Sequence, residues 1–251
     1  MKHLISSTRN EREISVNKGR GILLIGIVLG IFLVFAGCGE DSSTNPTGSG
    51  NPIGGSDNTS MSVKADNNIG DASSISITEA KALITEAELE TEPSGSSQHI
   101  RIAPFVIYFN TGGVLVTVTT GNLPSGTFNK IKFKIHKPEY SEPIPDPEFR
   151  DGPSGNQRYS FIIKGTYNGS SFVYKSRKSA SLVINLPAPI STGSNSRNIT
   201  VLVNPSLWFT SGGNFIDPRN SGNENIIDDN LKNSFKRAFK DDNKDGLPDD
   251  N

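Results

Sequence analysis

The stretch GTFNKIKFKIHK, residues 126–137, carries a clear strand pattern. From Ile131 onward, apolar residues and lysines alternate one by one, with Ile131, Phe133 and Ile135 on one side of the pattern. Successive side chains of a β-strand point to opposite faces of its sheet, so strict alternation is typical of a strand with one buried face. We expect the lysine face to lie in solvent, where it also discourages aggregation between sheets.

Further segments of β character lie on both sides of this stretch. Asn168-Gly169 separates two of them, and Asn-Gly is the strongest short signal of a hairpin turn. Short strands separated by Gly, Pro and Asn predict a mostly β protein. We expect an antiparallel β-sandwich, immunoglobulin- or prealbumin-like, over residues 72–210. The other predicted strands lie within 99–110, 112–123, 158–176, 179–187 and 198–209.

The segment ITEAKALITEAELETE, residues 77–92, fits two structures. Its good helix formers place Ile77, Ala80 and Ile84 at helical spacing. Its later residues instead alternate, with glutamates between apolar positions, and this pattern favours a strand. We predict a strand that pairs with residues 99–110, and we keep the helix as the alternative.

A family resemblance rests on the order of two motifs, ITEAKALITEAELE followed by GNLPSGTFNKIKFKI. This order resembles uncharacterised β-rich domains of exported bacterial lipoproteins, over residues 72–210. The resemblance implies a fold and a compartment, and it implies no activity.

The N-terminal region is typical of an export signal. Residues 21–37 are all apolar or glycine, and five basic residues precede them. The single cysteine of the chain, Cys38, follows directly. Ala36, Gly37 and Cys38 resemble the bacterial lipobox, although Phe35 departs from the aliphatic residue usual there. The resemblance implies a signal peptide over 1–37, a lipid on Cys38, and a place in the bacterial outer membrane or at the cell surface. An uncleaved signal anchor without lipid is the alternative.

Residues 38–71 are predicted to form a flexible tether. Ser, Gly, Asn, Thr and Pro dominate its first two thirds. Without residues 1–37 the chain carries 20 basic and 24 acidic residues, a net charge of −4, because five basic and two acidic residues lie in the leader. A mildly acidic chain without a basic block is not expected to bind nucleic acid.

No catalytic motif is evident in the sequence. The GxSxG turn is absent, and His99 and His136 are expected to be solvated. We therefore expect no enzyme but a binding or structural module, whose glycan or protein ligand is unidentified. Trp208 could stack on a sugar, although a buried aromatic is favoured. The alternative is a hydrolase that uses acidic residues of the proline-rich loop, residues 137–156. These are Glu139, Glu142, Asp146 and Glu148.

The C-terminal region, residues 211–251, is expected to contain a loop, one helix and an acidic tail. Ile227, Leu231, Phe235 and Phe239 recur at four-residue steps, which predicts an amphipathic α-helix over 223–240.

The tail after this helix suggests a calcium loop. Oxygen ligands at positions one, three and five, a glycine at six and a backbone carbonyl at seven suit Ca²⁺. The tail resembles the calcium loops of EF-hands, dockerins and thrombospondin-type repeats. Position twelve, the bidentate glutamate of EF-hands, would be residue 252, beyond Asn251. A solvated acidic tail is the alternative. The implied ligands are Asp241, Asn243, Asp245, Leu247 through its carbonyl, and Asp249.

Overall fold

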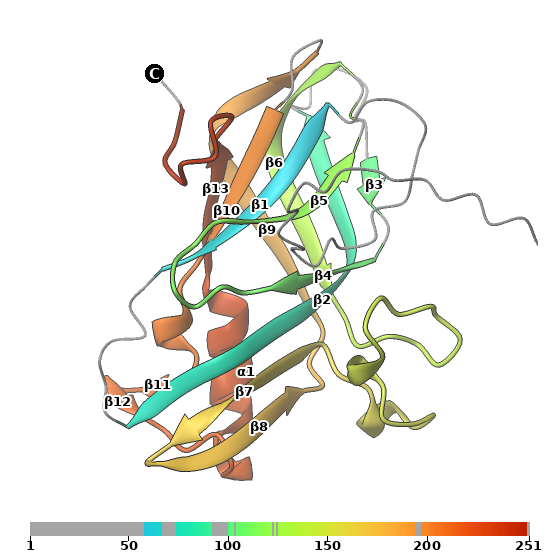
Figure 1. Cartoon of the computed structure of the whole chain (residues 1–251). Coiled ribbons are helices and arrows are strands. Elements are labelled where there is room, and N and C mark those ends of the chain that lie inside the picture. The colour runs from blue at the N-terminus through green and yellow to red at the C-terminus, as the bar shows by residue number, and fades with distance from the viewer. Residues whose placement is uncertain are drawn as a thin grey trace, which may run out of the picture. The chain divides into compact units, whose positions relative to one another are not determined.

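A computed structural model describes residues 58–66, 74–91, 100–102, 104–121, 123, 125–193 and 197–249. This part of the chain is mostly β and contains one α-helix (Figure 1). The predicted signal peptide, Cys38, His99 and most of the predicted tether lie outside the described residues. Within them, no helix is both long and apolar enough to cross a membrane.

The larger sheet is organised around one long strand, β2. The first half of β2 pairs with β7 and its second half with β6, while β4 and β3 pair along its other edge, all antiparallel. Strand β8 extends the sheet beyond β7, and β9 extends it beyond β6. This confirms a strand over residues 77–92 and its pairing with 99–110. The bounds are β2 (Ile75–Thr91), β3 (Ile100–Ile102), β4 (Phe105–Tyr108), β6 (Gly126–Ile135), β7 (Phe161–Tyr167), β8 (Ser170–Ser176) and β9 (Ala180–Thr192).

The smaller sheet has the order β13-β10-β1-β5. Strands β1 and β10 run parallel, whereas the other two pairs are antiparallel, so the expectation of a wholly antiparallel arrangement was wrong for one pair. The bounds are β1 (Thr59–Ala65), β5 (Val116–Gly121), β10 (Arg197–Val203) and β13 (Phe235–Lys240).

Strand β1 corrects the predicted tether, because it lies inside residues 38–71. Met61, Val63 and Ala65 alternate with Ser60, Ser62 and Lys64 and are at most 3% exposed. This alternation is short and was hidden by the surrounding Ser- and Asn-rich composition. Asn58 fixes the start of the strand: its Nδ2 donates to the Leu123 carbonyl at 2.7 Å, and its Oδ1 accepts from the Leu123 amide at 2.8 Å. The folded domain therefore includes residues 58–65, ahead of the predicted start at residue 72.

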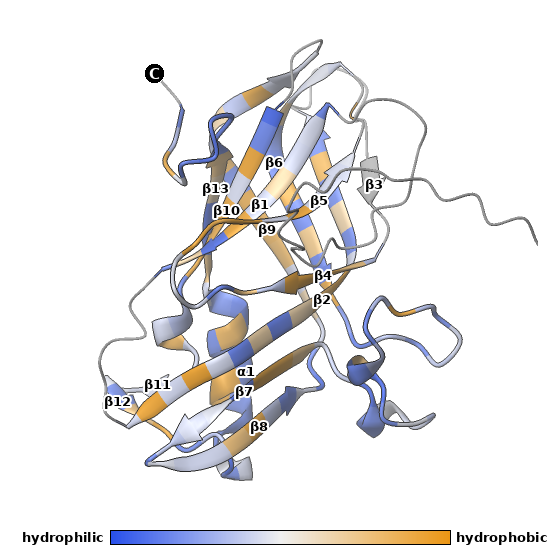
Figure 2. Cartoon of the chain, in the orientation of Figure 1, coloured by the Kyte–Doolittle hydropathy of each residue, from blue (hydrophilic) through white to orange (hydrophobic). Residues whose placement is uncertain are grey.

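The two sheets contribute to one hydrophobic core. Ile131, Phe133 and Ile135 of β6 are buried in it, as the alternation predicted, and Figure 2 shows that alternation along the strand. Strands β5 and β13, at the edges of the smaller sheet, lie beside β4 and β9 of the larger one. Trp208 is 1% exposed and meets Phe109 edge-on, with ring centroids 5.4 Å apart. Trp208 is therefore a core residue and not a sugar platform.

The lysine face of β6 is paired across the sheet with glutamates of β2. The directly opposed residues are Lys130 with Glu90, Lys132 with Glu88, and Lys134 with Glu86. Lys132 also forms an ion pair with Glu90. Opposed charges of this kind favour one register over a slipped one, because a slip would bring like charges together or separate the pairs. The face is therefore a ladder of opposite charges rather than only a solvated row of lysines.

The predicted helix over 223–240 is correct in its first half and wrong in its second. Helix α1 (Glu224–Asn233) buries Ile227 and Leu231 in the core. The chain then enters β13, which pairs with the edge of β10. Ala238 faces the core. Phe239 pairs with Thr200 across the strands and faces the other side of the sheet. Both side chains are buried. Pairing with an open strand edge outweighed the local helical spacing.

Short elements complete the fold. The predicted turn at Asn168-Gly169 is confirmed: it joins β7 to β8 with φ of 49° and 76° at its two residues. The remaining elements are 3-10 turns and a two-stranded ribbon. They are η1 (Pro147–Phe149), η2 (Gly155–Gln157), η3 (Pro205–Leu207), η4 (Ser221–Asn223), β11 (Thr210–Ser211) and β12 (Asn214–Phe215).

Gly165 of β7 gives a test of the close packing between β7 and β2. A Cβ added there would lie 2.0 Å from the backbone oxygen of Ser76. The β2–β7 register shifts close by, between Ile77 and Glu79. We expect Gly165→Ala to destabilise the domain by about 1–3 kcal/mol in urea unfolding. The control is Gly193→Ala, where a Cβ meets no atom within 4 Å and little change is expected. Equal stability of the two variants would contradict this packing.

Candidate functional site

The proline-rich loop folds over the outer face of the larger sheet, away from the main core. Phe149 is the centre of this contact and is 0% exposed. It packs with Leu83 of β2, Val106 of β4 and Ile162 of β7 in a second, smaller hydrophobic cluster. The loop is therefore a packed part of the fold and not a solvated excursion.

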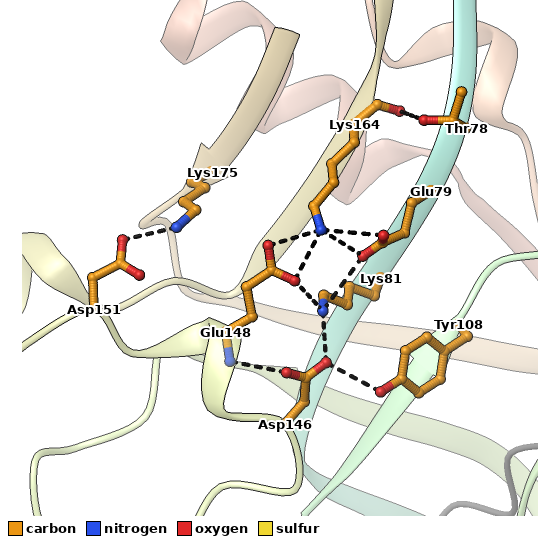
Figure 3. Close-up of polar contacts among 9 residues, drawn as sticks. All are labelled: Thr78, Glu79, Lys81, Tyr108, Asp146, Glu148, Asp151, Lys164 and Lys175. Atoms are coloured by element: carbon orange, nitrogen blue, oxygen red, sulfur yellow. Dashed lines mark hydrogen bonds and ion pairs between the residues drawn. The ribbon is translucent and has the colours of Figure 1, made fainter.

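A cluster of charges surrounds this contact and is centred on Lys81 (Figure 3). The Lys81 ammonium lies 2.6 Å from a carboxylate oxygen of Asp146 and 2.5 Å from one of Glu148. Its distance to Glu79 is 3.4 Å. Lys164 of β7 lies 2.9 Å from Glu148 and 3.1 Å from Glu79. Two lysines of the sheet thus hold two carboxylates of the loop.

The alternation of β2 explains how a lysine comes to be buried. Ala80, Ala82 and Ile84 face the main core, so Lys81 and Leu83 face outward. The loop then covers this outer face and leaves Lys81 only 4% exposed. The ammonium also lies 5.7 Å from the centre of the Phe149 ring, within the range of a cation–π contact.

The charges of the cluster stabilise one another. Burial alone would lower the pKa of Lys81, but hydrogen bonds and attraction from Asp146 and Glu148 more than offset it and raise the pKa. Burial alone would raise the pKa of Asp146 and of Glu148, yet the hydrogen bonds to Lys81 lower both pKa values. The Tyr108 hydroxyl adds a hydrogen bond to Asp146 at 3.1 Å. Both carboxylates are therefore ionised and paired at neutral pH.

This arrangement does not suit general acid catalysis. A catalytic acid near neutral pH needs a raised pKa, which burial or a neighbouring carboxylate provides. Asp146 and Glu148 instead have lowered pKa values and share one ammonium. Glu139 pairs with Arg158 at 2.8 Å, and Glu142 accepts the Glu139 amide at 2.7 Å. Each of the four carboxylates considered for a hydrolase thus has a polar partner in the described structure.

The predicted calcium ligands form a compact turn after β13. Asp241 is fully buried, and one of its carboxylate oxygens accepts from the Thr200 hydroxyl at 2.6 Å and from the Gly246 amide at 3.0 Å. Its other oxygen accepts from the Asp245 amide at 3.0 Å. Gly246 has a φ of 78°, a conformation that glycine adopts without strain. Asp241 therefore ties the turn to the middle of the smaller sheet.

The remaining predicted ligands also accept backbone amides. Asn243 accepts from the Asp245 amide at 3.0 Å, and Asp245 accepts from the Leu247 amide at 2.7 Å. Asp249 accepts from the amide of Asp242. These bonds bring the side chains of the four polar residues into one turn, as their spacing predicted. In the described part of the chain, however, no group of three or more His, Cys, Asp or Glu is placed to hold a metal.

The fit to Ca²⁺ is therefore partial. Carboxylate and amide oxygens are the right donors for a hard cation, and an oxygen that accepts a single hydrogen bond keeps a second lone pair. One Asp241 oxygen, however, already accepts two hydrogen bonds. Hydrogen bonds from backbone amides and from the Thr200 hydroxyl hold the oxygens of this turn. These bonds do not by themselves direct the oxygens toward one centre. The residues that would hold an ion are Asp241, Asn243, Asp245, Asp249 and the carbonyl of Leu247.

Comparison of the chain with protein-family models, with curated proteins and with solved structures found no match.

The sequence indicated the acidic side of the charge cluster but missed its basic side. Asp146 and Glu148 were identified as paired carboxylates of the loop. Lys81, by contrast, occupies a polar position in the alternating pattern of β2, and such a position is normally exposed to solvent. The five prolines and the apolar Ile144 and Phe149 were the available signal that the loop packs against something.

Lys81 should contribute far more to stability than Lys164. Removing one partner of a buried ion pair costs about 3–5 kcal/mol, whereas pairs nearer the surface contribute about 0–1 kcal/mol. Lys81 has 5% of its side chain exposed and Lys164 has 30%. We expect Lys81→Met to lower the free energy of unfolding at pH 7 by about 3 kcal/mol or more. The matched Lys164→Met should lower it by about 1 kcal/mol or less.

The same pair of variants tests the pH dependence. The pKa values of Asp146 and Glu148 in the fold lie below their ordinary values of 3.8 and 4.5. Their stabilisation is therefore fully present above those ordinary values and is lost as the pH falls through the lowered ones. The gap between wild type and Lys81→Met should shrink in urea titrations as the pH falls below about 4. A gap independent of pH would mean that Lys81 acts by packing alone.

Proposed function

We propose that this chain is a lipid-anchored module of a bacterial cell envelope that acts by binding or scaffolding and not by catalysis. The observation that carries the non-catalytic part is the pairing of Asp146 and Glu148 with Lys81, which occupies the strongest candidate acids of the chain. The anchored part rests on the sequence, where Cys38 follows the apolar run 21–37 within a lipobox-like motif.

The domain is proposed to be a β-sandwich of immunoglobulin or prealbumin type. Two sheets that share one core support the sandwich. A sandwich of this kind is a rigid support that displays loops, and loops on rigid supports often carry binding sites. The proline-rich loop is the best placed candidate, since ion pairs and Phe149 fix it to the sheet. Its ligand would be a glycan or a protein of the cell surface.

A structural Ca²⁺ in the C-terminal turn belongs to the same proposal. An ion there would offset the mutual repulsion of Asp241, Asp245 and Asp249 and hold the end of β13. The role is structural, because Asp241 is buried and bonded to Thr200 in the smaller sheet. Weak binding, with a Kd of about 10⁻⁴ to 10⁻³ M, is typical of extracellular modules.

The lipid anchor predicts the mass and the partitioning of the mature protein. We expect the wild-type chain, expressed in a bacterium, to begin at an acylated Cys38 and to partition into detergent. Several acyl chains anchor stably because each buried methylene contributes about 0.8 kcal/mol. The variant Cys38→Ala should keep residues 1–37. An intact mass showing residues 1–37 retained in the wild type would instead support the signal anchor.

The calcium turn predicts a saturable heat on titration. At about 2 mM Ca²⁺ and a Kd of about 0.2 mM, binding to the folded state adds about 1.4 kcal/mol of stability. Asp245→Ala should abolish both the heat and the stabilisation. Asp229→Ala removes an equal charge from the exposed face of α1 and should preserve both. Absence of heat up to several millimolar Ca²⁺, or equal heat from Asp245→Ala, would leave a solvated acidic tail.

A further inference from the structure

The proline-rich loop and the main core lie on opposite faces of the larger sheet. The main core takes the inward residues of β2, such as Ala82 and Ile84, whereas Phe149 packs with the outward residue Leu83. The two hydrophobic clusters share no residue. Lifting the loop from the sheet would therefore break the small cluster and leave the large one intact.

Much of the hydrogen bonding of the loop is internal. Arg150 donates to the carbonyl of Glu139 at 2.5 Å and to that of Glu142 at 2.7 Å. The Asp151 amide donates to the carbonyl of Gln157 at 2.8 Å, which closes the end of the loop. These bonds lie within residues 139–157, so they do not have to break when the loop leaves the sheet.

The attachments of the loop to the sheet are of two kinds. One is the burial of Phe149 against Leu83, Val106 and Ile162. The other is polar. Ion pairs join Asp146 and Glu148 to Lys81 and Lys164, and Asp151 to Lys175 of β8 at 2.7 Å. The Tyr108 hydroxyl of β4 donates to Asp146 at 3.1 Å, and the Tyr159 amide, just before β7, donates to the Phe149 carbonyl at 2.9 Å. Figure 3 shows these ion pairs along one side of the loop.

We infer that the proline-rich loop is a strap that opens from the sheet as a unit while the main core stays folded, and that Lys81 is its fastening. Proteins open in cooperative units whose free energies lie below that of global unfolding when few contacts hold the unit to the rest. The open form would uncover an apolar patch made of Leu83, Val106 and Ile162, with the Lys81 ammonium beside it.

Native-state hydrogen exchange of the purified full-length chain tests this inference. The probes are the amide of Tyr159, which donates to the Phe149 carbonyl of the loop at 2.9 Å and loses this partner when the loop lifts away, and the amides of residues 131–135 in β6. In the wild type, the Tyr159 amide should exchange faster, and its exchange should depend less steeply on urea, because opening the strap exposes less surface than global unfolding. Equal rates and equal urea slopes for the two sets would overturn the inference.

A core variant separates strap opening from global unfolding. Ile131→Val weakens the main core in the closed and the open form alike. It should speed exchange in β6 by about 2- to 10-fold, which corresponds to the cost of one buried methylene. It should leave the exchange of the Tyr159 amide unchanged. A matching acceleration of the Tyr159 amide would show that the loop opens only when the whole domain unfolds.

The fastening is tested by the two lysine variants. Lys81→Met should speed exchange of the Tyr159 amide at least tenfold. Lys164→Met, at a more exposed position of the same cluster, should change it by less than about fivefold. Unchanged exchange of the loop in Lys81→Met would show that Phe149 alone holds the strap and that Lys81 is not its fastening.

Discussion

The structure depends on the pairing of β2 with two successive strands along one edge. A strand of 17 residues is long enough to pair with β7 over its first half and with β6 over its second. This arrangement joins the β7–β8 hairpin to the β6–β9 pair in one sheet. Because side chains alternate along β2, the same strand supplies both faces: alanines and Ile84 to the main core, and Lys81 and Leu83 to the underside of the proline-rich loop.

The sequence predicted those elements whose local pattern agreed with their surroundings. Ile131, Phe133 and Ile135 alternate with lysines, and Asn168-Gly169 forms a turn that needs positive φ. The sequence did not predict the elements whose partner strand lies far along the chain. Strand β1 is short and serine-rich, and it is held between β10 and β5. Residues 235–240 carry helical spacing, yet they follow the open edge of β10, which no local pattern reveals.

The candidate site shows the same division. Asp146 and Glu148 were identifiable as paired carboxylates, and the spacing from Asp241 to Asp249 correctly indicated that these side chains gather in one turn. The counter-charge could not be predicted. Whether a polar residue of a strand faces water or a covering loop depends on tertiary packing, and this decides whether Lys81 is a surface lysine or a buried one.

The position of β1 has a mechanical consequence. The first described residue, Asn58, leads directly into a central strand with neighbours on both sides, β10 parallel and β5 antiparallel. If the domain is held by a partner and pulled along β1 through the residues before Asn58, the hydrogen bonds to both neighbours are loaded together in shear. An edge strand loaded in the same direction would share the force with one neighbour only. The position of β1 thus spreads such a load over two ladders of hydrogen bonds.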